Sequence, residues 1–245
     1  MTKRRILKLS GPDTTEFLQG LVTNDVTKAS QGLVYAAMLT PQGKFIADFF
    51  LSRVPDGILL DVAESHADML TTRLNMYKLR ADVAIEGSGL QLHRGLGPCP
   101  EDGMADPRHA DLGWRAYRTT PQTDDDVDWL SLRVSLEVPE TGVELTSDSF
   151  ILEMGFERLS GVDFRKGCYV GQEVTARMKH KTELRKGLAL VSLEGDAASG
   201  DDITADGKPA GTLHSIADGQ ALAYLRFDRA TREMEAGNAK VQRVS

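Results

Sequence analysis

The sequence predicts an α+β protein with antiparallel sheets and a β-rich C-terminal domain, and three patterns support this prediction. Three strand-like runs between residues 33 and 62 are separated only by short turns, the connection that antiparallel strands use. Residues 65–79 carry apolar side chains at helical spacing. From residue 187 onward, short β-like runs alternate with turns rich in Gly and Asp, as in a small barrel or sandwich.

The N-terminal elements follow from local signals. Gly11-Pro12 ends the first strand, and Asp13 is expected to begin a helix in which Glu16 completes a capping box. Ser65 is expected to cap the helix at 65–79. The strands that we expect in this half of the chain are 6–9, 33–39, 45–53, 58–62 and 82–85.

The second half of the chain holds fewer helical signals. Residues 129–138 alternate as a strand does, residues 149–159 have a helical pattern, and Gln172 is expected to open a further helix. The short β segments that we expect in the tail are 188–193, 212–216, 221–227 and 240–244.

Composition excludes several classes of protein. Hydrophobic residues make up 41% of the chain and charged residues 27%, which is ordinary for a soluble globular protein. No apolar run approaches the roughly 20 residues that span a bilayer, and no apolar signal core follows the basic start, so we expect a cytoplasmic protein. The two cysteines, Cys99 and Cys168, form no Cys-x-x-Cys pair, so we expect neither a disulfide framework nor a metal site built by this chain alone.

Charge is spread unevenly along the chain. The net charge of −7 argues against general nucleic-acid binding, because phosphate neutralisation needs a positive surface. Residues 165–186 nevertheless carry +5, so the remainder carries −12. This window is either a solvated face or an anion-binding surface around Cys168. Its basic residues are Arg165, Lys166, Arg177, Lys179, Lys181, Arg185 and Lys186.

The most informative stretch is the basic motif around Cys168. Gly167 and Gly171 bracket a Cys-Tyr-Val core, which implies a tight backbone path. Nearby positive charge favours the thiolate, the reactive form of cysteine, and this setting favours a reactive Cys168 over a buried inert one. His180 is either a base for this thiol or one member of the basic surface.

Residues 166–173, followed by Arg177, resemble the signature K-G-C-[FY]-x-G-Q-E-x-x-x-R of the YgfZ family of folate-binding proteins, relatives of the glycine-cleavage T-protein. The members of the signature here are Lys166, Gly167, Cys168, Tyr169, Val170, Gly171, Gln172 and Glu173. Further segments that resemble the family are 18–26, 41–44, 77–80 and 211–215.

The resemblance implies a T-protein-like three-lobed ring with antiparallel sheets, a central hole that holds tetrahydrofolate, and a C-terminal β-barrel. Residues 1–180 would form the folate-binding region of two interleaved α+β lobes, and residues 181–245 the barrel domain. Family members support iron–sulfur enzymes, including those that modify tRNA, and need the motif cysteine. The implied partners are therefore folate and iron–sulfur client or assembly proteins, with neither DNA nor a membrane.

The resemblance places Trp129 against folate, for which the alternative is a strand tryptophan that fills the core, and it places Asp48 where the T-protein has a pair of acids. We further hypothesise that Arg177, Lys179 or Arg185 holds the folate glutamate tail. Cys168 would react, with Lys166 holding its thiolate by charge and with Gln172 and Glu173 ordering the loop.

Three functions stay open at this point. The first is a tetrahydrofolate-binding accessory factor for cluster assembly or repair, and the second is a folate-dependent aminomethyl transferase. Ala47 and Ser135 stand where the transferase would have acids, which weakens the second reading. A tRNA-binding module ranks last, because the basic window lacks the stacking aromatics of single-strand readers.

Overall fold

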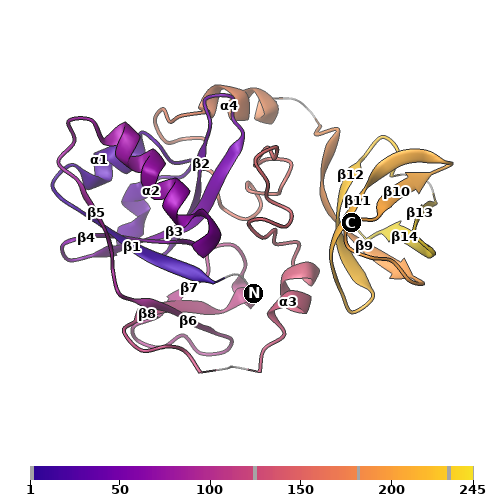
Figure 1. The fold of residues 1–245 in the computed structure, drawn as a ribbon, viewed down its shortest axis with the longest axis horizontal. Coiled ribbons are helices and arrows are strands. Elements are labelled where there is room, and N and C mark those ends of the chain that lie inside the picture. Colours follow the sequence, from indigo (N-terminus) through magenta and orange to yellow (C-terminus); the bar gives the residue numbers. More distant parts are fainter. Residues whose placement is uncertain (1–2, 124–125, 181–182, 231–232, 245) are drawn as a thin grey trace. The chain divides into compact units, whose positions relative to one another are not determined.

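The computed structural model describes residues 3–123, 126–180, 183–230 and 233–244. The chain divides into two compact units (Figure 1). The N-terminal unit comprises Thr2–Val127 and Phe156–Val174, and the barrel unit comprises Asp128–Gly155 and Thr175–Ser245. Lys181, the first residue of the predicted C-terminal domain, lies outside the described residues.

The N-terminal unit is built on two antiparallel sheets. Five strands lie in the order β2-β3-β4-β1-β5, and three short strands form a second sheet in the order β6-β8-β7. The strands are β1 (Arg4–Ser10), β2 (Val34–Leu39), β3 (Phe45–Val54), β4 (Gly57–Ala63), β5 (Ala84–Gly87), β6 (Gln91–Gly95), β7 (Met104–Ala105) and β8 (Trp114–Arg118). The helices of this unit are α1 (Thr14–Gln19), α2 (Glu64–Lys78) and the 3-10 helices η1 (Val26–Ser30) and η2 (Ala110–Leu112).

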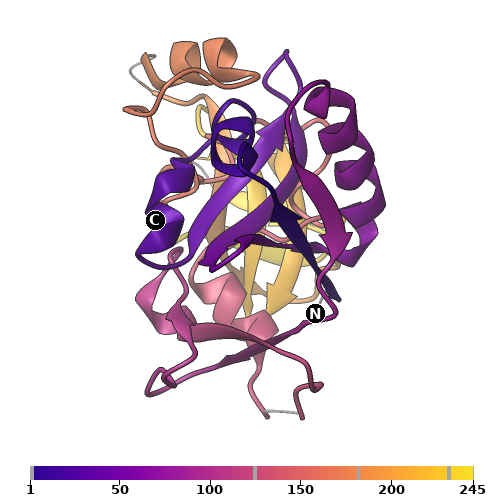
Figure 2. The same cartoon turned by 90° about the vertical axis from the view of Figure 1, so that its left-hand side faces the viewer.

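Helix α2 covers one face of the five-stranded sheet (Figure 2). Its buried residues Ala67, Leu70 and Leu74 join the core formed by β1, β3 and β4. Fully burying a leucine side chain contributes roughly 1.5–3 kcal/mol, so this stripe fixes the helix on the sheet. Strands β2 and β4 are buried along their whole length, which means that the opposite face of the sheet is also covered.

The barrel unit is a closed antiparallel barrel in the order β10-β11-β12-β9-β14-β13. Closure leaves no unpaired edge, and side chains such as Val191, Leu213 and Leu225 fill the interior. Helix α3 (Trp129–Ser135) packs against β11 and β12. The strands are β9 (Lys186–Glu194), β10 (Asp202–Ala205), β11 (Lys208–Ala217), β12 (Gln220–Arg226), β13 (Met234–Ala236) and β14 (Ala239–Arg243). Helix α4 (Gln172–His180) begins in the N-terminal unit and ends in the barrel unit.

A buried arginine holds α3 to the barrel. Arg133 donates from Nη1 to Glu144 Oε2 at 2.9 Å, and its Nη2 donates to the Ser215 hydroxyl of β11. Glu144 Oε1 in turn accepts from the Ser215 backbone N–H at 3.2 Å. Both charged side chains are buried, and each neutralises the charge of the other.

The fold class is confirmed, since the structure is α+β with antiparallel sheets and a C-terminal β-barrel. The helix at Gln172 is also confirmed. The strand expected at 129–138 is wrong, because Asp128 accepts from the N–H groups of Leu130 and Ser131 and so caps a helix there. The helix expected at 149–159 is a series of turns, interrupted by Gly155 at φ 78°.

The helix predicted to begin at Asp13 is confirmed, with Asp13 in the N-cap position of α1, but its predicted capping box is not formed. Asp13 accepts from the backbone N–H of Asp82 at 2.7 Å, so its carboxylate joins two segments and does not cap the helix. The cap predicted at Ser65 is wrong. Helix α2 begins at Glu64, directly after β4, which places Ser65 inside the helix.

Candidate functional site

The motif loop, residues 166–171, presents Cys168 between two buried side chains. Lys166 is 8% exposed and Tyr169 is 7% exposed, whereas Gly167 and Cys168 between them are exposed. The loop therefore holds its backbone at both ends and offers the thiol to solvent.

Lys166 is the first of these two anchors. Its ammonium donates to Gln19 O at 2.7 Å and to Val22 O at 2.6 Å, where α1 ends, and lies 5.2 Å from the centre of the Tyr169 ring. Carbonyls at a helix C-terminus attract positive charge. Burial lowers the pKa of Lys166 to about 8, although the nearby carboxylates of Asp25 and Asp163 act to raise it.

Gly171 anchors the other end of the loop. Its φ is 85°, and a Cβ atom there would lie 2.6 Å from Thr40 O and 2.9 Å from Leu39 Cβ. Across the same contact, a Cβ on Gly43 would lie 2.8 Å from Val174 Cβ. The loop and the start of α4 are thus seated on the β2–β3 turn at a distance that excludes side chains at both glycines.

The segment that leads into the motif is tied to the edge of the sheet by Thr23 and Asn24. Thr23 Oγ1 donates to Gly161 O at 2.7 Å and accepts from a backbone N–H of β2 at 2.8 Å. Asn24 Nδ2 donates to Ser160 O at 2.7 Å and to a carbonyl of β2 at 2.8 Å. These two side chains therefore form hydrogen bonds with backbone groups at the edge of β2, and they hold the segment that continues to Cys168 in place.

These contacts bring together three of the segments that carried the family resemblance. Residues 18–26 hold Lys166 and the segment before it, and residues 41–44 lie against Gly171. The loop that carries Cys168 is thus supported by Gly43, Gly171, Lys166, Thr23 and Asn24.

The remaining motif residues lie on α4. Gln172 opens the helix and donates from its backbone N–H to Tyr169 O at 3.2 Å, while Glu173 in the first turn is exposed. Arg177 is exposed in the last turn and belongs to the barrel unit. Lys181 of the basic window lies outside the described residues.

The two residues proposed to contact folate are buried. Asp48 is 4% exposed, and its Oδ2 accepts from the Tyr35 hydroxyl at 3.0 Å. Trp129 is 8% exposed at the start of α3 in the barrel unit.

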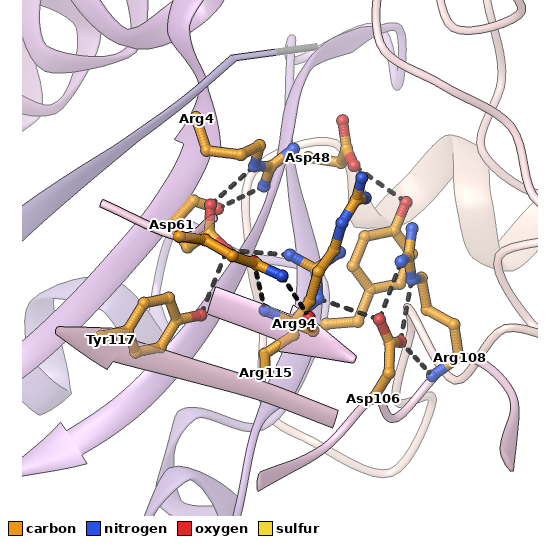
Figure 3. Close-up of polar contacts among 10 residues, drawn as sticks. Arg4, Asp48, Asp61, Arg94, Asp106, Arg108, Arg115 and Tyr117 are labelled. Carbon is orange, nitrogen blue, oxygen red and sulfur yellow. Dashed lines mark hydrogen bonds and ion pairs between the residues drawn. The ribbon is translucent and has the colours of Figure 1, made fainter. Parts of the chain in front are cut away.

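Asp48 lies on the second face of the five-stranded sheet, which carries a buried cluster of charges (Figure 3). Asp61 accepts from Arg4 Nε at 2.6 Å, from Arg115 Nη1 at 3.0 Å and from the Tyr117 hydroxyl at 3.1 Å. Because β1, β4 and β8 supply these groups, the cluster joins the three-stranded sheet to the five-stranded one.

A second carboxylate extends the cluster. Asp106 accepts from Arg115 Nε at 2.9 Å and from Arg108 Nη2 at 2.8 Å. The Arg115 guanidinium lies 3.9 Å from the centre of the buried Phe50 ring, which adds a cation–π contact. Burial alone would raise the pKa of Asp106, but the two guanidinium groups outweigh it and hold the pKa well below its ordinary value.

Sequence reasoning missed this cluster, although a signal was present. Asp48 and Asp61 interrupt the apolar runs 45–51 and 57–63, which are buried along their whole length. A carboxylate buried in such a strand needs a cationic partner, so these two positions imply buried arginines elsewhere in the chain. Asp106 and Arg108 come from residues 95–111, whose Gly, Pro and Asp content is typical of a loop or a shortened segment.

Known proteins resemble the chain in sequence and in fold. Residues 185–244 match the family described as "CAF17, C-terminal beta-barrel domain". The chain is 32% identical to the mitochondrial iron–sulfur cluster assembly factor IBA57 of Mus musculus, over 92% of this chain and 76% of that protein. The chain belongs to the IBA57 family.

Other IBA57 proteins match less completely. The homologue from Mycosarcoma maydis is 32% identical over 77% of this chain, which spans about half (55%) of that protein's length. Human IBA57 is 29% identical over 91% of this chain and 72% of that protein. The fold is that of the aminomethyltransferase T of Bartonella henselae, with a TM-score of 0.79, 14% identity and coverage of 98% of this chain and 82% of that one.

Membership of the IBA57 family corrects one expectation. These relatives are named as mitochondrial proteins, which overturns the plain cytoplasmic location expected from the sequence. The comparisons show a T-protein-like fold and membership of the IBA57 family, and they do not support the narrower YgfZ designation. Among the described residues, no helix is long and apolar enough to cross a membrane.

Proposed function

We propose that this chain is an iron–sulfur cluster assembly factor in which the Cys168 thiol binds one iron of a cluster as the cluster passes between proteins. One observation carries the proposal: Cys168 is exposed on a loop whose two flanking side chains, Lys166 and Tyr169, are buried. The names of the IBA57 relatives, which are iron–sulfur cluster assembly factors, support the same role.

The chemistry of clusters then calls for a partner. Cysteine binds iron as the thiolate, and a cluster is commonly held by four protein ligands. This sequence contains only two cysteines, and Cys99 lies in a separate loop between two prolines. Cys168 would therefore supply one ligand, and an assembly or client protein would supply the others. A ligand shared in this way lets the cluster leave when the partner replaces the thiolate.

A rigid backbone suits this exchange. The loop has few conformations to lose when a partner approaches, so less of the binding energy is spent on ordering it. Apart from its two neighbours in the chain, no described residue has an atom within 4 Å of the position where a Cβ on Gly167 would stand, which leaves open space next to Cys168. An incoming iron or partner side chain would use that space.

The test is complementation of a strain that lacks the gene. Cys168→Ser should abolish the recovery of iron–sulfur enzyme activity, measured against an enzyme without a cluster, and Cys99→Ser should recover it fully. Both variants should show the melting temperature of the wild type, because both cysteines are exposed. Full recovery with Cys168→Ser would refute the proposed role of the thiol.

Tetrahydrofolate binding stays a prediction that rests on the family resemblance. Asp48 and Trp129 are both buried and offer a ligand little exposed surface, so no step is derived through folate. Calorimetry with tetrahydrofolate decides the question: micromolar binding that weakens in Trp129→Ala and survives in Cys168→Ala would establish a folate site beside the thiol. Absence of binding would leave the role in cluster assembly as the only proposed function.

The aminomethyl transferase stays the alternative. The positions that lack its acids are Ala47, which is fully buried, and Ser135, whose hydroxyl donates to Leu132 O at 3.0 Å. Incubation with folate and an aminomethyl donor would show a one-carbon product only if other residues replace those acids. Clients that modify tRNA, and the narrower YgfZ assignment, likewise stay predictions of the resemblance.

A further inference from the structure

The solvent-facing side of α2 carries a row of exposed apolar side chains. Met69 is 38% exposed, Met76 is 63% exposed, and Leu79, the residue directly after the helix, is 90% exposed. Seven residues separate the two methionines, which places them on the same side of the helix two turns apart. We refer to Met69, Met76 and Leu79 as the α2 patch.

Leu79 occupies a backbone conformation that disfavours its side chain. Its φ is 41°, and helices that end with positive φ usually have Gly there, because a Cβ atom makes this region costly. The neighbours hold the turn in place: Tyr77 and Ala81 pack on the core, and the Ala81 N–H donates to Lys78 O at 2.7 Å. The chain thus keeps a strained leucine whose side chain contacts mainly water, so the side chain gains nothing in the isolated unit.

Most of the exposed charged side chains next to the α2 patch in sequence are basic, and Asp82, three residues after Leu79, is the exposed acid there. Arg73 and Arg80 are both exposed beside the patch, in a chain whose net charge is −7. The nearest acid on α2, Asp68, already forms an ion pair with Arg5. A symmetric contact with a second copy would place two sets of mainly basic side chains, Arg73 and Arg80 from each copy, at one interface, which is unfavourable. A partner with acidic side chains around an apolar contact is complementary instead.

We propose that the α2 patch is the docking surface for an iron–sulfur assembly or client protein whose contact face is apolar at the centre and acidic at the rim. An apolar centre with a charged rim is the usual anatomy of a protein interface, and methionine adapts to differently shaped partners. The class of partner rests on the proposed function, whereas the location and the chemistry of the surface rest on α2 alone.

The first experiment identifies the occupant. A photo-crosslinking amino acid replaces Met76, and a control replaces Leu96, an equally apolar loop residue of the same unit that is 44% exposed. Crosslinking in living cells, followed by mass spectrometry, should yield an acidic iron–sulfur assembly or client protein from position 76 and not from position 96. Equal products at both positions, a second copy of the chain, or a protein unrelated to clusters would each overturn the proposal.

The second experiment measures binding of that purified crosslinked protein. Leu79→Gly should weaken the affinity by about tenfold or more, as the loss of a central interface residue does. The same variant should keep or raise the melting temperature, because Gly relieves the strain at φ 41°. Arg80→Glu should weaken binding and reduce its salt dependence, while Leu96→Gly should leave the affinity unchanged. Unchanged affinity in Leu79→Gly, or a marked loss of stability, would overturn the proposal.

Complementation separates this proposal from the proposed function. If Cys168→Ser fails and Leu79→Gly restores iron–sulfur enzyme activity fully, only the docking surface is refuted. If Cys168→Ser succeeds, the role of the thiol is refuted whatever the α2 patch binds.

Discussion

The two glycines of the motif loop should respond very differently to the same change. In Gly171→Ala, the new Cβ would lie 2.6 Å from Thr40 O and 2.9 Å from Leu39 Cβ, at a φ of 85°. In Gly167→Ala, the new Cβ would meet no atom within 4 Å, and φ is not positive. One methyl group therefore tests whether the loop is seated on the β2–β3 turn as the structure describes.

The cost of Gly171→Ala has two parts. A non-glycine residue in the left-handed region costs about 1–2 kcal/mol, and overpacking against backbone typically costs about 1–3 kcal/mol. Their sum lowers the free energy of unfolding by about 2–5 kcal/mol, which for a chain of this size is a fall in melting temperature of roughly 5–15 °C. Gly167→Ala should change stability by less than about 0.5 kcal/mol, as exposed substitutions do.

Urea denaturation measures the stability of both variants, and the alkylation rate of Cys168 reports on the loop. A Cys99→Ser background is needed because Cys99 is also exposed and would react. Gly171→Ala should change the alkylation rate as the loop leaves its seat, and Gly167→Ala should leave that rate near the value of the parent protein. Equal stability of the two alanine variants would refute the packing of the loop on the turn.

Three further predictions concern buried charges. Asp61→Asn should lower the free energy of unfolding by about 3–5 kcal/mol, because it leaves buried arginines without a carboxylate, while Asp56→Asn, which removes an exposed ion pair, should change nothing measurable in the same urea titration. The pKa of Asp106 lies below its ordinary 3.8, so its contribution to stability is present above pH 4 and is lost as the pH falls below that value; Asp106→Asn should remove this loss from a stability–pH profile. The pKa of Lys166 is lowered from 10.5 to about 8, so the unfolded chain keeps a proton that the folded chain has released and stability should rise with pH between these values; Lys166→Met should abolish the rise, and a flat wild-type profile would contradict it.

Periodicity predicted most of the framework of the chain. The apolar run at 45–53 between two turns corresponds to β3, which is buried on both faces. The helical spacing at 65–79 corresponds to α2, which buries one face against the core. The strand predicted at residues 129–138 is wrong for a physical reason. Their pattern also fits a short helix that buries Trp129 and Arg133, and Asp128 favours the helix over the strand because it caps the helix. Capping contacts of this kind depend on where a side chain finds its partner, as the carboxylate of Asp13 shows.

The sequence predicted which residues belong to the candidate site, but it predicted only part of their three-dimensional arrangement. The motif resemblance singled out Lys166 and Cys168, but the partners of Lys166 are carbonyls of residues 19 and 22, and no local pattern reveals a contact between segments about 145 residues apart. The buried charge cluster depends even more on tertiary structure, because its members come from β1, β4, β8 and the loop before β8. Sequence alone could say only that Asp48 and Asp61 require cations.

The arrangement around Cys168 reconciles two opposing requirements of a thiol that exchanges cargo. Such a thiol must be exposed, yet a mobile exposed loop would lose conformational entropy each time a partner binds. Here the loop is ordered by its contacts with the N-terminal unit. The Lys166 ammonium donates to two backbone carbonyls, and Gly171 lies too close to the β2–β3 turn for a side chain. The ammonium of Lys166 therefore serves to position the backbone of the loop. Its removal should therefore impair cluster delivery through disorder of the loop, and Lys166→Arg, which keeps the charge but not the two short contacts of the lysine, should rescue little.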